Sequence, residues 1–164
     1  SFSKIVVKNK IGVDPVSGGN IRSTSDQFFI KNKINFDIIF IDGLHHYEQV
    51  IKDVNNSLKI LNENGFILLH DCLPRSIAHQ AIPRYRGSWN GDVWKALVEL
   101  RTRSDLDTHT CQIDFGVGIV QKKKNTEILS VEIKNFKNLK FSDYYNNFNS
   151  YMRVVNYKKA LELI

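Results

Sequence analysis

One stretch, residues 36–74 (FDIIFIDGLHHYEQVIKDVNNSLKILNENGFILLHDCLP), constrains the fold of this chain more than any other. It opens with a nearly unbroken apolar run over 36–41, which is typical of a strand covered on both faces. Apolar residues then recur at steps of three and four, as on one face of a helix: Tyr47, Val50, Ile51, Val54, Leu58 and Leu61. Asn64 and Gly65 predict the end of this helix, because both residue types tolerate the positive φ of a C-cap. A second apolar run, over 66–69, predicts a second buried strand.

The order of these elements fixes where two acidic residues lie. A strand-helix-strand unit within one sheet is almost always a right-handed crossover between parallel strands. Asp42 follows the first strand and Asp71 follows the second, so both belong to the carboxyl edge of the sheet. Ligands of open α/β sheets bind at that edge. The sequence therefore predicts an α/β fold with a candidate site around these two carboxylates.

Composition describes an ordinary globular chain. The 164 residues are 42% hydrophobic and 24% charged, as in a single soluble domain. No apolar run approaches the roughly 20 residues that cross a bilayer, and the start lacks the apolar core of a signal peptide. Cys72 and Cys111 are too few for a disulfide framework. We expect a cytoplasmic protein without a membrane partner.

The positive charge is concentrated near the C-terminus. The net charge is +6, and residues 121–164 contribute nine Lys or Arg and four Asp or Glu, 9 − 4 = +5. A basic surface can attract nucleic acid or anionic membranes. Since no basic and aromatic pattern of a known nucleic-acid module is present, we interpret residues 123–164 as a basic, solvated extension of one domain over 1–164. We expect no nucleic-acid partner.

The remaining pattern predicts shorter elements. A strand over 10–13 is closed by Asp14, and residues 73–91 form a long irregular connection of the kind that often binds ligands. Asp92 is a candidate cap for a helix with an apolar face. Residues 108–114 and 116–122 predict an antiparallel hairpin, and residues 157–163 predict a final helix.

Several motifs together resemble the class I S-adenosylmethionine-dependent methyltransferases. They are IDGLHHY at 41–47, LLHDCLP at 68–74, GVDP at 12–15, TSDQFF at 24–29 and WNGDVWKAL at 89–97. The strand ends IDG-x-H-x-Y and HD are most similar to the small-molecule O-methyltransferases, and the resemblance covers roughly residues 5–122. It implies a Rossmann-like sheet, mostly parallel with a C-terminal antiparallel hairpin, and S-adenosylmethionine as the cofactor.

The family's first strand and its glycine-rich loop are missing from the pattern. That loop wraps the methionine end of the cofactor, and no such loop precedes Lys10. The strand would lie in the middle of the sheet, between the strands that end in Asp14 and Asp42, and its absence would expose two strand edges. We therefore expect a chain incomplete at its N-terminus, which either forms a homo-oligomer or packs differently around the gap.

The resemblance assigns cofactor contacts to five residues. Asp14 would accept hydrogen bonds from the ribose hydroxyls, Ser25 and Asp26 would contact the adenine, and Asp42 with Gly43 would complete the site at the next strand end. A structural alternative stands beside the first three of these roles. Asp14 can serve only the Asp-Pro turn, and Ser25 or Asp26 can cap the following helix.

Asp42 and Asp71 are also candidate metal ligands. Neighbouring strands lie about 4.8 Å apart, so the two carboxylates could share one Mg²⁺, which prefers oxygen ligands. Related enzymes often carry an Asn or another acid after the second Asp, whereas this chain has Cys72, a poor ligand for Mg²⁺. In the alternative reading Asp42 only contacts the cofactor and Asp71 only caps the next segment.

The candidate catalytic residues are His45, His46 and Asp71. A histidine has a pKa near working pH and can deprotonate a substrate hydroxyl. Adjacent side chains at the start of a helix diverge by about 100°, so we expect only one of the two histidines to face an acceptor. His70 is interpreted as a buried strand residue or a partner of Asp71, and Trp89 as a residue of the core or of a pocket wall.

The resulting hypothesis is methyl transfer from S-adenosylmethionine to a hydroxyl of a small-molecule acceptor. Two alternatives come from other classes. A metal-dependent hydrolase would use Asp42, Asp71 and His46, and would turn over without S-adenosylmethionine. A non-catalytic fragment would oligomerise around the missing strand and bind no cofactor.

Overall fold

The computed structural model describes residues 2–164, which divide after Ile34 into two compact units. The strands are β1 (Val13–Asp14), β2 (Ile21–Arg22), β3 (Phe36–Ile41), β4 (Leu61–Leu69), β5 (Asp107–Cys111), β6 (Val117–Gln121) and β7 (Val154–Val155). The α-helices are α1 (Ser25–Lys31), α2 (Tyr47–Ile60), α3 (Val93–Arg101), α4 (Phe141–Asn146), α5 (Phe148–Met152) and α6 (Tyr157–Leu163). Two short 3₁₀ turns cover Phe2–Lys4 and Phe136–Asn138.

The first unit holds a small parallel sheet and one helix. β1 pairs with β2, with Val13 opposite Ile21. The strand predicted over 10–13 is thus shorter and shifted, and it includes Asp14. Helix α1 begins after Thr24, whose hydroxyl accepts a hydrogen bond from the Gln27 amide at 3.3 Å. Thr24 therefore caps this helix, and Ser25 and Asp26 are its first two residues.

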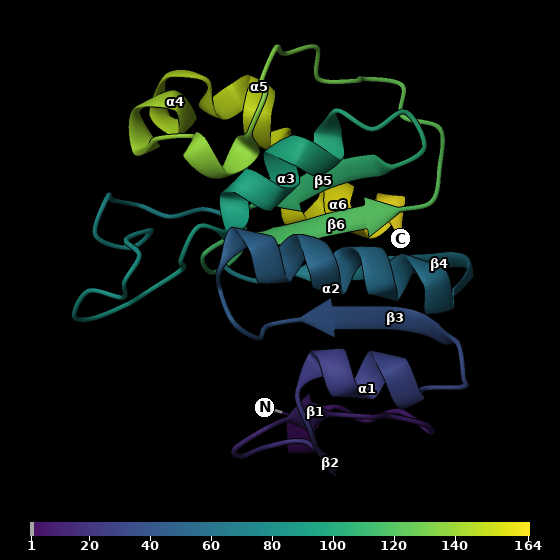
Figure 1. Cartoon of the computed structure of the whole chain (residues 1–164). Coiled ribbons are helices and arrows are strands. Elements are labelled where there is room, and N and C mark those ends of the chain that lie inside the picture. Colours follow the sequence, from purple (N-terminus) through teal and green to yellow (C-terminus); the bar gives the residue numbers. More distant parts are fainter. Residues whose placement is uncertain (1) are drawn as a thin grey trace. The chain divides into compact units, whose positions relative to one another are not determined.

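The second unit is built on a five-stranded mixed sheet in the order β3-β4-β6-β5-β7 (Figure 1). β3 and β4 are parallel, and helix α2 is the connection between them. β6 runs antiparallel to both β4 and β5, and β7 is parallel to β5. The predicted Rossmann-like α/β class, the crossover and the antiparallel hairpin are confirmed.

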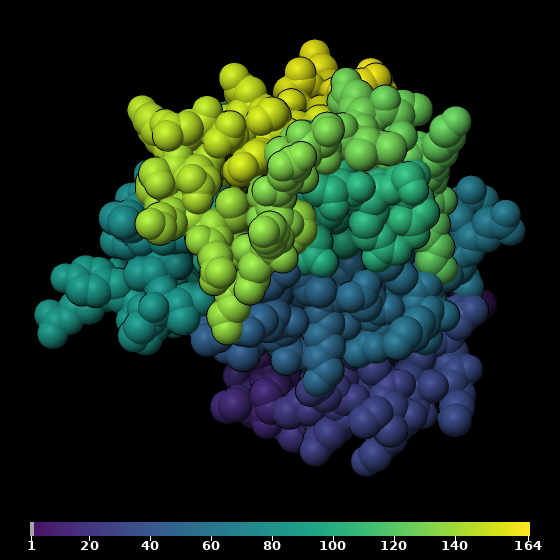
Figure 2. All heavy atoms as spheres, turned by 45° about the horizontal axis from the view of Figure 1, so that its top comes forward, coloured from purple at the N-terminus to yellow at the C-terminus, as the bar shows by residue number. Residues whose placement is uncertain are grey.

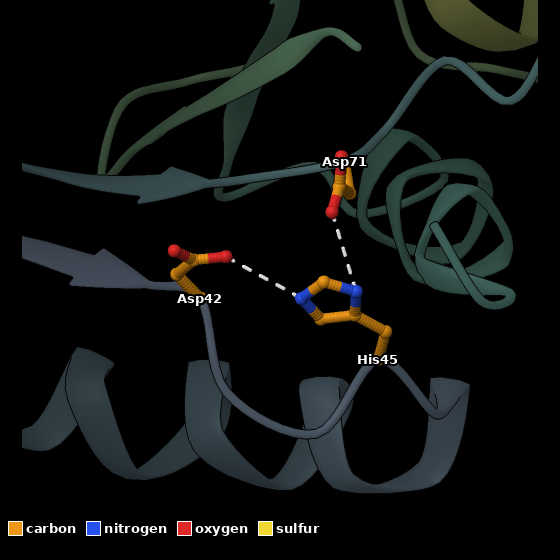
Figure 3. A group of neighbouring side chains, drawn as sticks. All are labelled: Asp42, His45 and Asp71. Atoms are coloured by element: carbon orange, nitrogen blue, oxygen red, sulfur yellow. Dashed lines mark hydrogen bonds and ion pairs between the residues drawn. The ribbon is translucent and has the colours of Figure 1, made fainter. Parts of the chain in front are cut away.

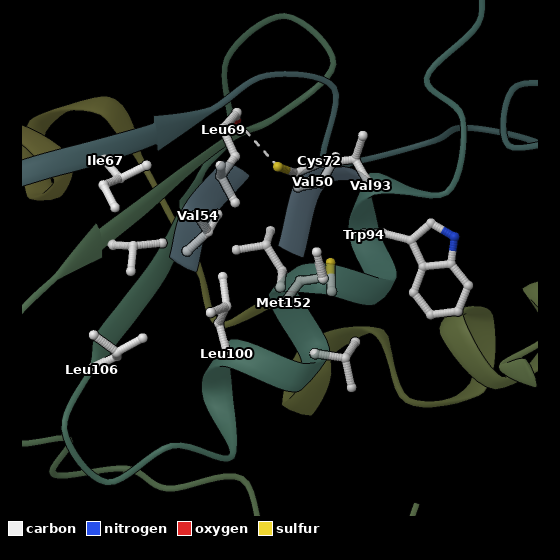
Figure 4. Packing of buried hydrophobic residues seen from close by; sticks show 14 of the residues in the cluster. Val50, Val54, Ile67, Leu69, Cys72, Val93, Trp94, Leu100, Leu106 and Met152 are labelled. Atoms are coloured by element: carbon white, nitrogen blue, oxygen red, sulfur yellow. Dashed lines mark hydrogen bonds between the residues drawn. The ribbon is translucent and has the colours of Figure 1, made fainter. Parts of the chain in front are cut away.

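The main core lies on one face of this sheet (Figure 4). Val50 and Val54 of α2 pack with Ile67 and Leu69 of β4, and the fully buried Trp94 of α3 joins them. Leu68, between the two inward residues of β4, belongs to a smaller cluster on the other face, with Ala160 of α6. This alternation is the period of two that a strand imposes on its side chains.

The segment expected to be a basic extension is part of this unit. Met152 of α5 is completely buried in the main core, and Tyr144 of α4 is 4% exposed. β7 hydrogen-bonds to β5 at the end of the sheet, and α6 covers residues 157–163 as predicted. Residues 123–164 therefore combine an exposed basic surface with apolar residues that close the core.

The predicted helix stop at Asn64 and Gly65 is wrong. Helix α2 ends at Ile60 and β4 begins at Leu61, so both residues lie inside the strand. Phe36 pairs with Leu61 but Ile38 pairs with Phe66, so residues 62–65 form a bulge. Asn64 does adopt a positive φ of 62°, but it uses that conformation in the bulge rather than in a helix cap.

The sheets break at the position expected from the sequence. β1 and β3 belong to different sheets, and β3 is the terminal strand of its own. Within residues 2–164 no strand pairs with the outer edge of β3. Ile38 and Phe40, on the face of β3 away from the main core, are 57% and 52% exposed. Homo-oligomerisation around this edge stays a prediction, as does the single domain over 1–164.

The connection between β4 and α3, residues 70–92, contains neither helix nor strand. Its middle part projects from the second unit (Figure 2), and its two ends return to the carboxyl edge of the sheet. None of the helices in residues 2–164 has the length and apolar character needed to cross a membrane.

Candidate functional site

Asp42, His45 and Asp71 gather at the carboxyl edge of the second unit's sheet (Figure 3). Ile41 pairs with Leu69 at the ends of β3 and β4, so the residues that follow the two strands emerge side by side. His45 lies in the turn that enters α2. One side-chain ligand atom from each of the three residues lies within 4.8 Å of the others. The placement of both carboxylates at one edge is confirmed.

The ring of His45 lies between the two carboxylates. Its Nε2 is 3.4 Å from Asp42 Oδ1, and its Nδ1 is 3.3 Å from Asp71 Oδ2. Nδ1 is also 3.4 Å from the carbonyl oxygen of Trp89. Two acceptors around Nδ1 favour the tautomer with its proton on that nitrogen. Asp42 Oδ1 is likewise an acceptor beside Nε2, so a protonated ring donates to both carboxylates, and in a neutral ring with its proton on Nδ1 the lone pair is on Nε2, beside a carboxylate that is 48% exposed.

The backbone turns sharply at Asp71. Its φ is 62°, a left-handed conformation that Asp adopts more readily than most residues but that still carries strain. The turn buries the side chain, so that the residue is 7% exposed, and Oδ1 accepts a hydrogen bond from Asn90 Nδ2 at 2.8 Å. With Oδ1 held in this way, Oδ2 faces His45.

His70, interpreted from the sequence as a buried strand residue or a partner of Asp71, lies beside the cluster, with Nδ1 3.4 Å from Asp71 Oδ2. Its Nδ1 is 3.1 Å from Asp42 Oδ1 and its Nε2 is 3.1 Å from Asp114 Oδ2. Asp114 lies in the turn between β5 and β6 with a φ of 49°. His70 therefore bridges the exposed carboxylate of the cluster and an acidic residue 44 positions away.

The two carboxylates of the cluster differ in acidity. Burial favours the neutral form of Asp71 and raises its pKa, although interactions with His70 and His45 act in the opposite direction. Burial would also raise the pKa of Asp42, but the hydrogen bond with His45 and the charge of His70 outweigh it, and this pKa is lowered. Burial lowers the pKa of His70, whereas the charge of Asp71 and the bond to Asp114 raise it, and the net change is upward. Carboxyl groups whose pKa values are pushed apart are suited to different roles in one reaction.

Cys72 does not contribute to this cluster. Its side chain is fully buried in the main core, and Sγ donates to the Leu69 carbonyl oxygen at 3.2 Å. Burial raises the pKa of the thiol, so the thiolate that a metal would bind is disfavoured. The position after Asp71 thus packs the core instead of extending the polar site.

The remaining predicted residues lie elsewhere. His46 occupies the N-cap position of α2, with its ring centroid 5.9 Å from that of Trp89, and lies outside the three-residue cluster. Gly43 lies in the exposed turn after Asp42, and an added Cβ there would meet open space. The structure thus brings His45, and not His46, to the carboxylates. The hydrolase hypothesis, which relied on His46, loses that ligand.

Asp14, Ser25 and Asp26 lie in the first unit. Asp14 Oδ1 accepts from the amides of Val16 at 2.7 Å and Ser17 at 2.5 Å. These bonds to Ser17 and Val16 lower its pKa. The carboxylate therefore stabilises the turn after β1, as the structural alternative expected, while contact with a cofactor remains a prediction for all three residues.

The donor atoms of the cluster fit a divalent cation. Two carboxylates and one imidazole nitrogen suit a first-row divalent metal as well as Mg²⁺, which would take the oxygens and keep several waters. The exposed side of Asp42 leaves room for further ligands. The same geometry also fits a histidine base held by a carboxylate, so both of the roles expected from the sequence remain chemically possible.

Open α/β sheets bind ligands at the carboxyl ends of their parallel strands, and in this α/β protein the acidic residues lie at that edge. Residues 14–72 match the family model described as a methyltransferase domain. This match supports the predicted methyltransferase class for that segment, and that family implies S-adenosylmethionine as the cofactor. Asp42, His45 and Asp71 all lie within the matched residues.

A solved protein from Corynebacterium glutamicum, determined in a structural genomics programme, resembles this chain with 15% identity and a TM-score of 0.46. The likeness covers 70% of this chain and 49% of that protein, so the present chain spans about half of the length of that relative. No curated protein matches the chain significantly.

Proposed function

We propose that these residues belong to a methyltransferase that transfers the methyl group of S-adenosylmethionine to a hydroxyl of a small molecule. The observation that carries the proposal is the cluster of Asp42, His45 and Asp71 at the carboxyl edge, inside the segment that matches the methyltransferase family. Transfer to oxygen requires a group that removes the hydroxyl proton as the methyl group arrives.

His45 is the proposed proton acceptor. Nδ1 is engaged by Asp71 Oδ2 and the Trp89 carbonyl oxygen, so in the neutral ring with its proton on Nδ1 the lone pair is on Nε2, which lies 3.4 Å from Asp42 Oδ1. Asp71 stabilises the imidazolium that forms, by the same logic as the carboxylate of a catalytic triad. Asp42, beside Nε2, orients the hydroxyl or accepts its hydrogen bond.

Asp42 and Asp71, with His45 Nε2, are also the residues that would hold a divalent cation. Such a cation, Mg²⁺ among others, supplies Lewis acidity that lowers the pKa of a hydroxyl bound to it. With a metal in place, the imidazole would be a ligand rather than the base. The two arrangements therefore differ in their response to chelation.

A cavity of about 730 Å³ supports an acceptor with an apolar body. It lies between the β4–α3 connection and α4, and its lining includes Ile77, Ile82, Phe141 and Tyr145. Asp92, whose amide donates to the His45 carbonyl oxygen at 3.1 Å, is another lining residue. The volume is in the range of small-molecule sites. Through Asp92, the wall of this cavity adjoins the turn that carries His45.

The test uses the full-length protein. Calorimetry with S-adenosylhomocysteine measures cofactor binding, and mass spectrometry of S-adenosylhomocysteine formed from S-adenosylmethionine reports turnover with phenols, sugars and aliphatic alcohols. We expect binding, and turnover with at least one hydroxyl compound of apolar body. Absence of cofactor binding by the full-length protein would refute the proposal, and turnover restricted to amines or carbon acids would refute its hydroxyl part.

A further inference from the structure

Four consecutive residues of the β4–α3 connection, Trp89 to Asp92, contact both His45 and Asp71. The Trp89 ring stacks on the His45 ring, with centroids 5.4 Å apart and planes at 22°. The Asp92 amide donates to the His45 carbonyl oxygen at 3.1 Å. Asn90 donates to Asp71. This segment, which we call the 89–92 clamp, therefore touches the side chain and the backbone of one cluster member and the side chain of another.

The clamp lies against His45 so closely that Gly91 has no room for a side chain. Gly91 has a φ of 60°, and a Cβ added there would lie 1.8 Å from the His45 carbonyl oxygen. The clamp itself is fixed from its other side, since the amides of Asn90 and Gly91 both donate to the His79 carbonyl oxygen, at 2.8 and 3.1 Å. The position of His45 is therefore set by a rigid backbone contact and not only by its own turn.

Asn90 is the informative member of the clamp. Its side chain is fully buried, and Nδ2 donates to Asp71 Oδ1 at 2.8 Å. Its Oδ1 is also buried and has no hydrogen-bond partner among residues 2–164. A buried acceptor without a partner is unfavourable, and a residue needed only to fill this space would be better replaced by an apolar one. The bond to Asp71 is thus the one interaction that explains an amide at this position.

We propose that Asn90 is a positioning residue, which fixes Asp71 Oδ1 so that Oδ2 is held 3.3 Å from His45 Nδ1 and Nε2 is left as the proton acceptor. The inference rests on the proposed function. It adds Asn90 as a third member to the pair formed by His45 and Asp71. The WNGD motif at residues 89–92 then acts through these two residues and does not contact the acceptor.

The test compares two buried asparagines in the full-length protein. Asn90→Leu keeps the approximate volume and removes both the donor and the unpartnered acceptor. Asn125→Leu is the matched control, since Asn125 is 4% exposed and both ends of its amide are bonded, Nδ2 to the carbonyl oxygens of Arg101 and Arg103 and Oδ1 to the Glu127 amide. Asn90→Ala serves as a second variant if leucine does not fit.

We expect kcat of Asn90→Leu to fall about 10- to 100-fold, the usual effect of losing a residue that orients a functional side chain, with the KM for S-adenosylmethionine unchanged. Its melting temperature should be equal to that of the parent or higher. The Asn125→Leu control should show the reverse, a lower melting temperature and an unchanged kcat. Equal kcat values for Asn90→Leu, Asn90→Ala and the parent would overturn the inference.

A second readout does not depend on turnover. The ¹⁵N chemical shifts of the His45 ring, assigned with a His45→Gln variant, report which ring nitrogen carries the proton. They should change in Asn90→Leu and Asn90→Ala and stay constant in Asn125→Leu. Changed shifts in a protein that transfers no methyl group would refute the proposed function and leave the positioning role intact. Unchanged shifts in both Asn90 variants would refute the positioning role.

Discussion

Asp92 caps helix α2 from a distant part of the sequence, because its Oδ1 accepts a hydrogen bond from the Tyr47 amide at 2.6 Å. The N-cap residue itself, His46, makes no side-chain capping bond with the described residues. The carboxylate also meets the positive end of the helix dipole. The same aspartate pairs with Lys95 at 3.2 Å, so one side chain connects the first turns of α2 and α3.

Replacing Asp92 with alanine should destabilise the protein by roughly 0.5–2 kcal/mol, the usual range for a lost N-cap. Asp92→Asn should retain most of the stability, since an amide oxygen can still accept from the Tyr47 amide. Urea unfolding measures the free energy of unfolding of both variants. Asp105→Ala is the control, because the Asp105 carboxylate forms only a surface pair with Arg103 at 2.6 Å and such pairs contribute little. Equal losses for Asp92→Ala and Asp105→Ala would show that the distant cap has no energetic role.

His45 and His46 form a natural matched pair for testing the base. Both rings contact Trp89, but only His45 lies between the two carboxylates. His45→Ala should lower kcat by about 10²–10⁴-fold, the usual contribution of a general base, whereas His46→Ala should lower it only slightly. If His46→Ala caused the larger loss, the assignment of the proton acceptor would be wrong.

Chelation separates the two uses of the cluster. If His45 acts as the base without a metal, EDTA should leave methyl transfer unchanged. If a cation lies between Asp42 and Asp71, EDTA should abolish the activity and added Mg²⁺ or Mn²⁺ should restore it. Assays before and after dialysis against EDTA measure this. Activity that survives both EDTA and His45→Ala would contradict both arrangements.

Asp14→Ala should weaken binding of S-adenosylhomocysteine to the full-length protein, because a hydrogen bond to a charged group is lost. Because Asp14 also stabilises its own turn, Asp14→Asn is the necessary comparison. Asparagine can still accept from the Val16 and Ser17 amides but lacks the charge. Calorimetry should show a loss in both variants, larger for alanine. Unchanged affinity in both would leave Asp14 as a turn residue only.

The stability of the second unit should depend on the ionisation of His109. Burial, and then the charge of Arg153, lower the pKa of this histidine in the folded protein. The unfolded chain then binds the proton more readily, with a pKa of about 6.5. The contribution of neutral His109 to the free energy of unfolding is therefore complete above pH about 6.5, and it is lost as the pH falls toward the folded-state pKa. Urea unfolding should show a smaller loss between pH 7 and pH 5 for His109→Gln than for the parent. An identical pH dependence of His109→Gln and the parent would contradict the lowered pKa of His109.

The sequence predicts the β3-α2-β4 unit well because the information there is local. Apolar runs and a helical repeat place Asp42 and Asp71 at one edge without any knowledge of the rest of the chain. The predicted end of the helix is wrong for a non-local reason. The pairing of Phe36 with Leu61 starts β4 earlier in the chain, so Asn64 lies in a bulge of the strand and not in a helix cap.

The polar partners of the cluster could not be predicted in the same way. His70 gains its role from Asp114, and Asp71 from Asn90, through contacts that span 44 and 19 residues. Cys72 stands where related enzymes often carry a metal ligand, and the left-handed turn at Asp71 sends its side chain into the core.

The unpartnered oxygen of Asn90 has a practical consequence for engineering this protein. A buried carbonyl oxygen without a hydrogen bond costs about 1–3 kcal/mol, so a selection for heat resistance should favour apolar residues at position 90 early. Functional sites often carry such local destabilisation, and variants improved in stability then lose activity. A library screened only for folding would therefore enrich well-behaved proteins whose aspartate and histidine no longer work together.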